Sequence, residues 1–309
     1  MGRAGKAWGW SGLAACLLVA IPLAAQKPDP NEEAAQKAFM ADLGRPPVWH
    51  LTQIKRMNAA IAALKPQRPG VVDAYVVSIG LDSDPVFGRE AAEAAKVLSR
   101  RYDAEGRTLL LAAGGGAGPV PNGSPANLQA ALAAVAGLMD PKEDVLVLYT
   151  TSHGAPKVGI VYKDGDNGYG FVAPKSLAGM MEGLGIRNRM VMISACYSGI
   201  FIPDLANDDT VLVTAASPVT TSFGCAPGND WTFFGDALIN NAFRAPAKLD
   251  EAMGQALSLI GNWEHLRGLP PSSPQFFVGA KARTWLQALE ARTPTTVTPR
   301  VGRPAIDEK

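Results

Sequence analysis

The chain has 309 residues, 47% of them hydrophobic, which allows one large domain or two small ones with an ample apolar core. It carries 29 Lys and Arg residues against 28 Asp and Glu residues, so its formal net charge is +1 at pH 7. Because such a balance provides no overall basic field, a nucleic-acid partner is not expected.

The first 25 residues have the three-part layout of a secretory signal peptide. Arg3 and Lys6 form a basic start, an apolar run extends to Leu23, and small residues follow up to Ala25. We expect cleavage after Ala25 and export to the periplasm or the medium. Two other fates stay open, an uncleaved anchor and a lipoprotein modified at Cys16. The protein would contact a membrane only in those two cases.

Composition divides the rest of the chain into three parts. Residues 26–66 are expected to form a linker with peripheral helices at 32–43 and 51–64. Residues 67–291 are expected to form the main domain. The tail at 292–309 is rich in Pro, Thr and charge without any periodicity, and it is predicted to be disordered.

Within the main domain, apolar strand patterns alternate with helical patterns. The predicted strands cover residues 71–79, 108–113, 144–150, 189–195 and 210–215. The predicted helices cover residues 89–102, 125–139, 174–184, 231–243, 249–265 and 280–291. Strands that are apolar throughout and separated by helices indicate a mainly parallel sheet covered on both faces. The fold class is therefore α/β, a three-layer sandwich.

A histidine and a cysteine each follow one of these strands. His153 comes after the strand at 144–150, and Cys196 comes after the strand at 189–195. The carboxyl ends of parallel strands meet at one edge of a sheet, so both side chains would face one crevice. A cysteine after an apolar strand is, taken alone, more often a small buried hydrophobe. The joint placement favours a thiol nucleophile with a histidine that carries its proton.

Two features beside His153 fit such a site. Gly154 could offer its amide to a developing oxyanion. The segment 158–172 has the pattern of a hairpin around a turn at 163–168. Because this hairpin follows His153, it would form a wall of the crevice.

Five short motifs occur in one order across this region. They are Ser-His-Gly at 152–154, Ala-Cys-Tyr-Ser-Gly at 195–199, Thr-Ala-Ala-Ser at 214–217, Ser-Phe-Gly-Cys at 222–225 and Phe-Gly-Asp at 234–236. Together they resemble the legumain-like cysteine peptidases of the caspase-like clan, above all the bacterial secreted or membrane-associated members. The resemblance covers roughly residues 71–243.

The resemblance implies a caspase-like sheet and a cysteine-type endopeptidase acting on peptides or proteins. His153 would be the catalytic histidine and Cys196 the nucleophile, and the amides of Gly154 and Cys196 would form the oxyanion hole. No metal and no organic cofactor would be needed. A transamidase or ligase could use the same thioester, and a catalytically silent caspase-like binding module is a further alternative. The oligomeric state is not predicted.

The substrate-binding residues follow from the resemblance less directly. In legumains an arginine, a histidine and two acids recognise an Asn or Asp side chain. Arg89 and Asp236 correspond to the arginine and to one acid, and Ser222 and Ser194 complete the predicted set. However, Ser194 stands where the other acid is expected, and Glu90 stands where the histidine is expected. These departures argue against carrying over asparaginyl specificity.

Two questions about neighbouring groups stay open. Arg89 could equally be a solvated charge in the first turn of a helix. The chain shows Phe87 and Gly88 where the family has an asparagine that orients the catalytic histidine, so that group is unassigned. After cleavage of the leader, Cys196 and Cys225 would form either one disulfide or two free thiols. The resemblance favours a structural role for Cys225 beside the pocket.

Overall fold

The computed structural model describes residues 1–2, 44–114 and 116–307. The remainder of the predicted leader, with Cys16, and the predicted helix at 32–43 lie outside the described residues. In the described ranges, none of the helices combines the length and the apolar character needed to cross a bilayer.

A six-stranded sheet runs through the centre of the domain in the order β2-β1-β3-β7-β8-β9. Its strands are β1 (Ala74–Gly80), β2 (Thr108–Ala112), β3 (Val145–Thr151), β7 (Arg189–Ser194), β8 (Thr210–Thr214) and β9 (Gln275–Val278). The first five are parallel to their neighbours, and β9 pairs with β8 in the antiparallel direction. The five predicted strands correspond to the five parallel ones.

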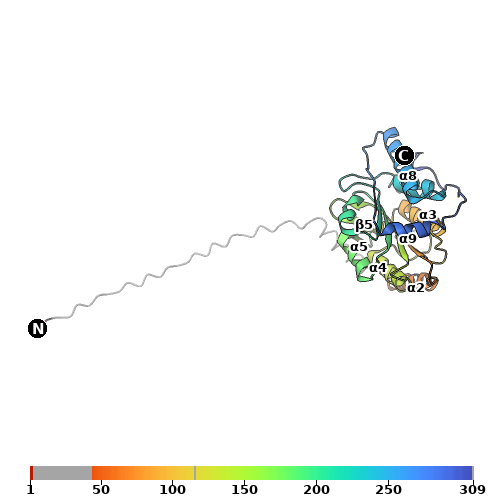
Figure 1. Ribbon diagram of the computed structural model, residues 1–309. Coiled ribbons are helices and arrows are strands. Elements are labelled where there is room, and N and C mark those ends of the chain that lie inside the picture. The colour runs from red at the N-terminus through yellow and green to blue at the C-terminus, as the bar shows by residue number, and fades with distance from the viewer. Residues whose placement is uncertain (3–43, 115, 308–309) are drawn as a thin grey trace.

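Helices cover both faces of this sheet (Figure 1). They are α2 (Pro47–Ala62), α3 (Pro85–Arg101), α4 (Pro125–Ala136), α5 (Pro174–Gly183), α6 (Ile202–Leu205), α8 (Leu249–Leu266) and α9 (Ala282–Glu290). Helices α3, α8 and α9 contribute to the core on one face, and α2, α4, α5 and α6 to the core on the other. The predicted α/β three-layer architecture is confirmed.

The side chains of β3 show why the strands are apolar throughout. Val145, Val147 and Tyr149 belong to the core beneath α3 and α8, whereas Leu146 and Leu148 belong to the core beneath α4 and α5. Successive side chains of a strand point to opposite faces, so a strand with a core on each face needs apolar residues at every position.

Proline marks the beginning of several helices. Pro47, Pro85, Pro125 and Pro174 each occupy the first turn of a helix, where the missing amide hydrogen costs nothing and the fixed φ suits the helix. Ser124 caps α4 by accepting a hydrogen bond of 3.2 Å from the amide of Asn127.

A second, smaller sheet confirms the predicted hairpin. It consists of β4 (Gly154–Ala155), β5 (Gly159–Lys163) and β6 (Tyr169–Val172), all antiparallel. The amide of Val161 donates to the carbonyl of His153 over 2.9 Å. The hairpin is therefore fixed directly to the backbone of the histidine.

The predicted helix at 231–243 is instead broken into α7 (Phe233–Gly235), a π-helix η2 (Asp236–Asn241) and a 3-10 turn η3 (Ala242–Arg244). In the wider π turn, the Asp236 carboxylate accepts hydrogen bonds from the side chains of Asn240 (2.8 Å) and Asn241 (3.1 Å). Buried polar groups therefore interrupt the regular α-helical hydrogen bonding here. π turns of this kind are often found near functional sites.

The C-terminal tail is ordered against the domain, so the predicted disorder is wrong for residues 292–307. The carbonyl of Val301 accepts from Nε1 of Trp231 over 2.9 Å, and the amide of Ala305 donates to Oδ2 of Asp236 over 2.7 Å. Ala305 is buried. The contacts use main-chain groups of the tail, which its side-chain composition does not reveal. Residues 308–309 lie outside the described part.

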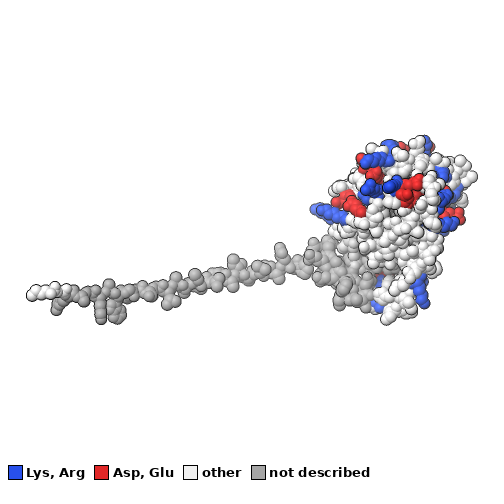
Figure 2. All heavy atoms as spheres, turned by 60° about the horizontal axis from the view of Figure 1, so that its bottom comes forward, with Lys and Arg blue, Asp and Glu red and all other residues white. Residues whose placement is uncertain are grey.

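Charged side chains of both signs are mixed on the surface that Figure 2 shows. Lys and Arg are interspersed with Asp and Glu over the upper part of this face, and the lower part is mostly uncharged. This face therefore presents no continuous basic patch for a polyanion.

Candidate active site

His153 and Cys196 lie beyond the carboxyl ends of two adjacent strands. β3 and β7 pair in register up to Thr151 and Ser194, and each candidate residue follows its strand by two positions. Both residues line one small pocket at this edge of the sheet. The structure thus brings together the two side chains that the sequence proposed as a dyad.

The turn after Cys196 is tight. Tyr197 adopts a left-handed conformation with φ 57°, and the 3-10 helix η1 (Ser198–Phe201) begins directly after it. A side chain at Gly199 would collide with Pro218 and with Gln275 of the edge strand β9. The reversal holds Cys196 at the mouth of the sheet and not inside the core.

Gly154 packs against the backbone of Cys196. An added Cβ at position 154 would overlap the carbonyl oxygen of Cys196, so only glycine allows this approach. The close approach also places the amide of Gly154 near the Cys196 sulfur, where it lowers the pKa of the thiol. The two amides proposed for an oxyanion hole, those of Gly154 and Cys196, therefore both lie beside the sulfur.

The surroundings of the Cys196 thiol favour its neutral form. Burial raises its pKa above the ordinary value, and the amides of Ser222, Gly154 and Cys196 offset this effect in part. The amide of Ser222 lies 3.3 Å from Sγ, and Sγ lies 3.5 Å from the carbonyl of the same residue. A buried neutral thiol needs a base to remove its proton during attack.

A carboxylate faces His153, and sequence reasoning missed it. Nε2 of His153 lies 3.4 Å from Oδ2 of Asp84, and the ring of Phe87 makes an edge contact with the imidazole at 4.9 Å between centroids. Asp84 directly precedes α3, yet its side chain does not cap that helix in the described structure. The Asp84 carboxylate is thus available to orient the imidazole, which leaves Nδ1 to exchange a proton with the sulfur.

The signal for Asp84 lies in the topology. It follows β1, and β1 is the neighbour of β3 in the sheet, so loops after both strands lie at the same edge. Asp82 precedes it and accepts a hydrogen bond of 2.9 Å from the amide of Asp84. Burial raises the pKa of Asp82, and the charge of His153 lowers it. The imidazole therefore interacts with two carboxylates, in contact with that of Asp84 and through charge with that of Asp82.

The wall opposite the dyad consists of uncharged side chains. Ser194, Ser222, Phe223, Cys225 and Thr232 line the pocket with His153 and Cys196. Ser194 and Thr232 share a hydrogen bond of 3.1 Å between their hydroxyls.

A model of the Peptidase C13 family matches residues 126–263. The legumain-like resemblance is confirmed. The matched Peptidase C13 segment contains His153, Cys196 and all five short motifs, and the family points to a cysteine peptidase. Asp84 and Arg89 precede the segment.

Comparison with solved structures found similarity at low sequence identity. One similar structure is caspase-1 from Spodoptera frugiperda, with 13% identity, a TM-score of 0.45, and coverage of 70% of this chain and 93% of that chain. A search of the curated proteins found no match.

Two of the four predicted substrate-binding residues, Arg89 and Asp236, lie away from the dyad. Arg89 donates to the carbonyls of Pro227 (3.0 Å) and Asn229, and its Nε lies 3.5 Å from Oδ1 of Asp230. Asp236 is buried and bound to the tail, and burial raises its pKa. Neither residue lines the pocket of the dyad, whereas the other two predicted residues, Ser194 and Ser222, do.

The two cysteines of the Peptidase C13 segment are free thiols. Cys225 lies in the wall of the same pocket as Cys196. Burial, followed by the charge of Cys196, raises the pKa of Cys225 to about 11. Cys225 is therefore a neutral lining group at physiological pH.

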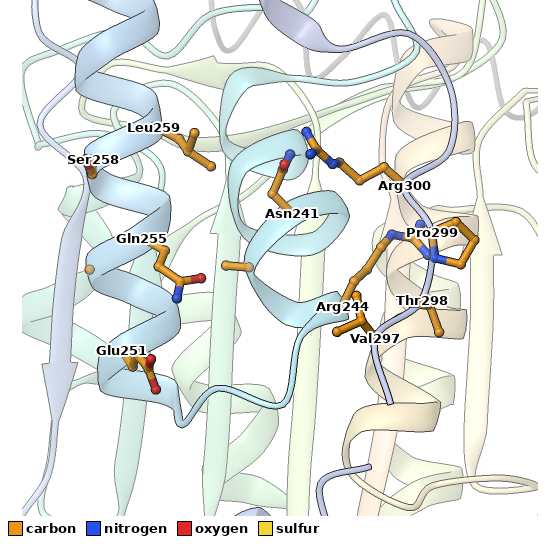
Figure 3. A pocket seen from close by; sticks show the side chains of 12 residues that line it. Asn241, Arg244, Glu251, Gln255, Ser258, Leu259, Val297, Thr298, Pro299 and Arg300 are labelled. Atoms are coloured by element: carbon orange, nitrogen blue, oxygen red, sulfur yellow. The ribbon is translucent and has the colours of Figure 1, made fainter. Parts of the chain in front are cut away.

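A separate cavity of about 900 Å³ lies between α8, η3 and the C-terminal segment 297–300 (Figure 3). Arg244 and Arg300 line it on one side, and Glu251 and Gln255 of α8 line the other. Its lining offers neither a thiol nor an imidazole. Within the described ranges, no three His, Cys, Asp or Glu side chains come together as metal ligands would.

Proposed function

We propose that the protein is an exported cysteine endopeptidase that cleaves peptide bonds through Cys196 and His153. The observation that carries this proposal is the position of the two side chains in one pocket, beyond the ends of adjacent strands, inside a Peptidase C13 segment. The export of the protein rests on the signal-peptide pattern of the first 25 residues.

The first half of the reaction forms a thioester. The thiol proton of Cys196 moves to Nδ1 of His153 while Sγ forms a bond to the scissile carbonyl carbon. The carbonyl π electrons move to the oxygen, which the amides of Gly154 and Cys196 stabilise. When the carbonyl re-forms, the C–N bond breaks, and the imidazolium proton passes to the leaving amine.

The second half regenerates the enzyme. A water molecule gives a proton to Nδ1 and adds to the thioester carbonyl, and the C–S bond then breaks. The sulfur takes back the proton, and the carboxylic product leaves. Asp84 acts throughout as a positioning residue, because its carboxylate stabilises the charged imidazole through Nε2.

A thiol-directed peptide warhead, such as a peptidyl chloromethyl ketone, tests this proposal under reducing conditions. We expect covalent labelling of folded protein that disappears in Cys196→Ala and persists in Cys225→Ala. The second variant is a matched control, because Cys225 lines the same pocket with a thiol of high pKa. Absence of labelling at Cys196 across warheads that carry small, amide, acidic and aromatic side chains would refute the proposal.

Analysis of the reaction products tests the fate of the thioester. Hydrolysis predicts a free carboxylate on the acyl fragment by mass spectrometry. A peptide amine joined to that fragment would instead identify a ligase.

A further inference from the structure

We propose that the pocket beside Cys196 accepts a small uncharged side chain, that of Gly, Ala or Ser, from the residue on the acyl side of the scissile bond. This inference rests on the proposed function and names its substrate class. A carbonyl carbon in contact with Sγ, with its oxygen at the amides of Gly154 and Cys196, places the acyl-side residue against the remaining walls of this pocket.

The depth of the pocket is limited by a fixed floor. The hydroxyls of Ser194 and Thr232 bond to each other across it, and both residues are almost fully buried. Oγ1 of Thr232 also accepts from the amide of Gly235 over 2.9 Å, so its rotamer is held. The side chains of Ser194 and Thr232, which form the floor, are therefore fixed in position, and their two hydroxyl groups give it its polarity.

A buried carboxylate prevents the floor from receding. Glu90 has no exposed surface and lies behind Thr232, whose amide donates to Oε2 over 2.9 Å. The hydroxyl of Tyr149 donates to Oε1 over 2.8 Å, and an added side chain at Gly235 would collide with this carboxylate. Displacing such a bonded charge is costly, so a long side chain cannot push the floor back.

The sides of the pocket are filled as well. Phe223 and Cys225 occupy the wall that faces the dyad, and the ring of Phe223 is held against Phe233 at 6.0 Å between centroids. The cavity that remains is about 10 Å³, so only a small side chain fits without displacing these walls.

Charged side chains find no partner in this pocket. Among the described residues that line it there is no Lys, Arg, Asp or Glu, and Nε2 of the one histidine, His153, faces Asp84. Arg89 is committed to the 227–230 loop. An acidic side chain would lose its hydration without gaining a cation and would approach the Glu90 carboxylate behind the floor.

A set of fluorogenic peptides that differ only in the acyl-side residue tests the inference with the full chain. We expect kcat/KM for Ala, Ser and Gly to exceed that for Asn at least tenfold, and that for Asp, Arg and Phe at least a hundredfold. A preference for Asn, Asp, Arg or Phe would overturn it.

Two variants sharpen the test. Each is judged by the ratio of kcat/KM between two substrates, which reports specificity and not a general loss of activity. Cys225→Ala removes a lining sulfur, so the ratio of Val to Ala cleavage should rise at least fivefold. Arg89→Gln is the matched control outside the pocket, and it should leave the ratio of Asp to Ala cleavage unchanged. A fall of that ratio in Arg89→Gln would show that Arg89 recognises the substrate and would overturn the inference.

Labelling by different warheads distinguishes a failure of this inference from a failure of the proposed function. Warheads that carry Ala, Asn, Asp or Phe are compared for labelling of Cys196. If the Asn or Asp warhead labels fastest, the peptidase stands and the pocket assignment is wrong. If none labels Cys196, the peptidase itself is wrong.

Discussion

The two sides of the active-site pocket are held by different kinds of interaction. On the dyad side, His153 and Cys196 extend from β3 and β7, whose parallel register fixes the loops that follow. On the opposite side, the segment 222–236 contains no strand and is held by α3 and by the C-terminal tail. The sheet thus positions the reacting groups, and contacts between residues far apart in the chain position the substrate wall.

The contacts of the wall are polar and long-range. Arg89 of α3 binds the backbone at 227–229, and Arg303 of the tail donates to the carbonyl of Gly228 over 2.7 Å. The amide of Arg303 donates to Asp230, and Trp231 donates to Val301. Each such bond is modest in water, but together they order residues 227–231, which belong to no helix or strand.

The largest expected effect is on catalytic activity, and it comes from a change in the dyad and not in the wall. His153→Ala should lower kcat/KM by at least about 10³-fold, because no second histidine or carboxylate is among the described residues that line the pocket. The double variant with Cys196→Ala should be no less active than Cys196→Ala alone, since the two residues act as a unit. Peptide hydrolysis measures both. Additive losses in the double variant would contradict the dyad.

Removing the C-terminal tail should disrupt the wall at 222–236 and leave the central sheet folded. Truncation after residue 295 deletes the bonds to Trp231 and Asp236 and leaves a buried carboxylate without its amide partner. We expect a loss of more than about 3 kcal/mol in the free energy of unfolding by urea denaturation. A truncation at 307 is the control and should be neutral. Equal stability of the two truncated chains would show that the tail contributes nothing.

Asp84 belongs to the dyad side because it contacts His153, although it follows a different strand, β1. Asp84→Asn should lower kcat by about 10- to 100-fold with little change in KM, because the imidazole loses a charged partner without losing a substrate contact. Asp166→Asn, at a turn of the hairpin, serves as the control. A rise in KM with kcat unchanged would place Asp84 in substrate binding.

The resting state of the thiol predicts a pH dependence of alkylation. The pKa of Cys196 is raised, so the thiolate is the minor form at neutral pH, and its fraction increases about tenfold for each pH unit until the pKa is reached. The rate of iodoacetamide labelling at Cys196, followed by mass spectrometry, should therefore still increase above pH 8. A plateau below pH 7 would indicate a thiolate that is already ionised at rest.

The smallest effect concerns a single bond of the wall. Trp231→Phe removes the indole donor to Val301 and leaves most of the buried ring in place. We expect a loss of about 1 kcal/mol in the free energy of unfolding. Phe233→Leu, a substitution in the same core without a polar group, provides a comparison for the packing contribution. No loss in Trp231→Phe would show that water replaces the bond.

The sheet and the dyad could be predicted because their signals are local. An apolar run such as 145–151, ending in Ser-His-Gly, identifies a buried strand and the loop that follows it. The strand β9 was missed because it has only four residues, follows a stretch rich in Pro and Ser, and pairs in the antiparallel direction.

The wall could not be predicted because its signals are distributed over the chain. Val301 and Ala305 contact the wall through main-chain groups, which no short motif records. Asp84, on the dyad side, was missed for a related reason, because its carboxylate reaches His153 from the loop after a different strand. Asp236 matches a family acid in sequence, yet its carboxylate binds the tail and not the pocket. A motif therefore located the residue but not its role.

The tail also determines when the pocket can form. A chain is synthesised from its N-terminus, so β3, β7 and both dyad residues are complete well before residues 296–307 emerge. Until then Trp231 and Asp236 lack their hydrogen bonds to the tail. A partly synthesised chain would carry its nucleophile without a finished substrate wall, and this order of assembly would delay proteolysis by the proposed enzyme until the tail is complete.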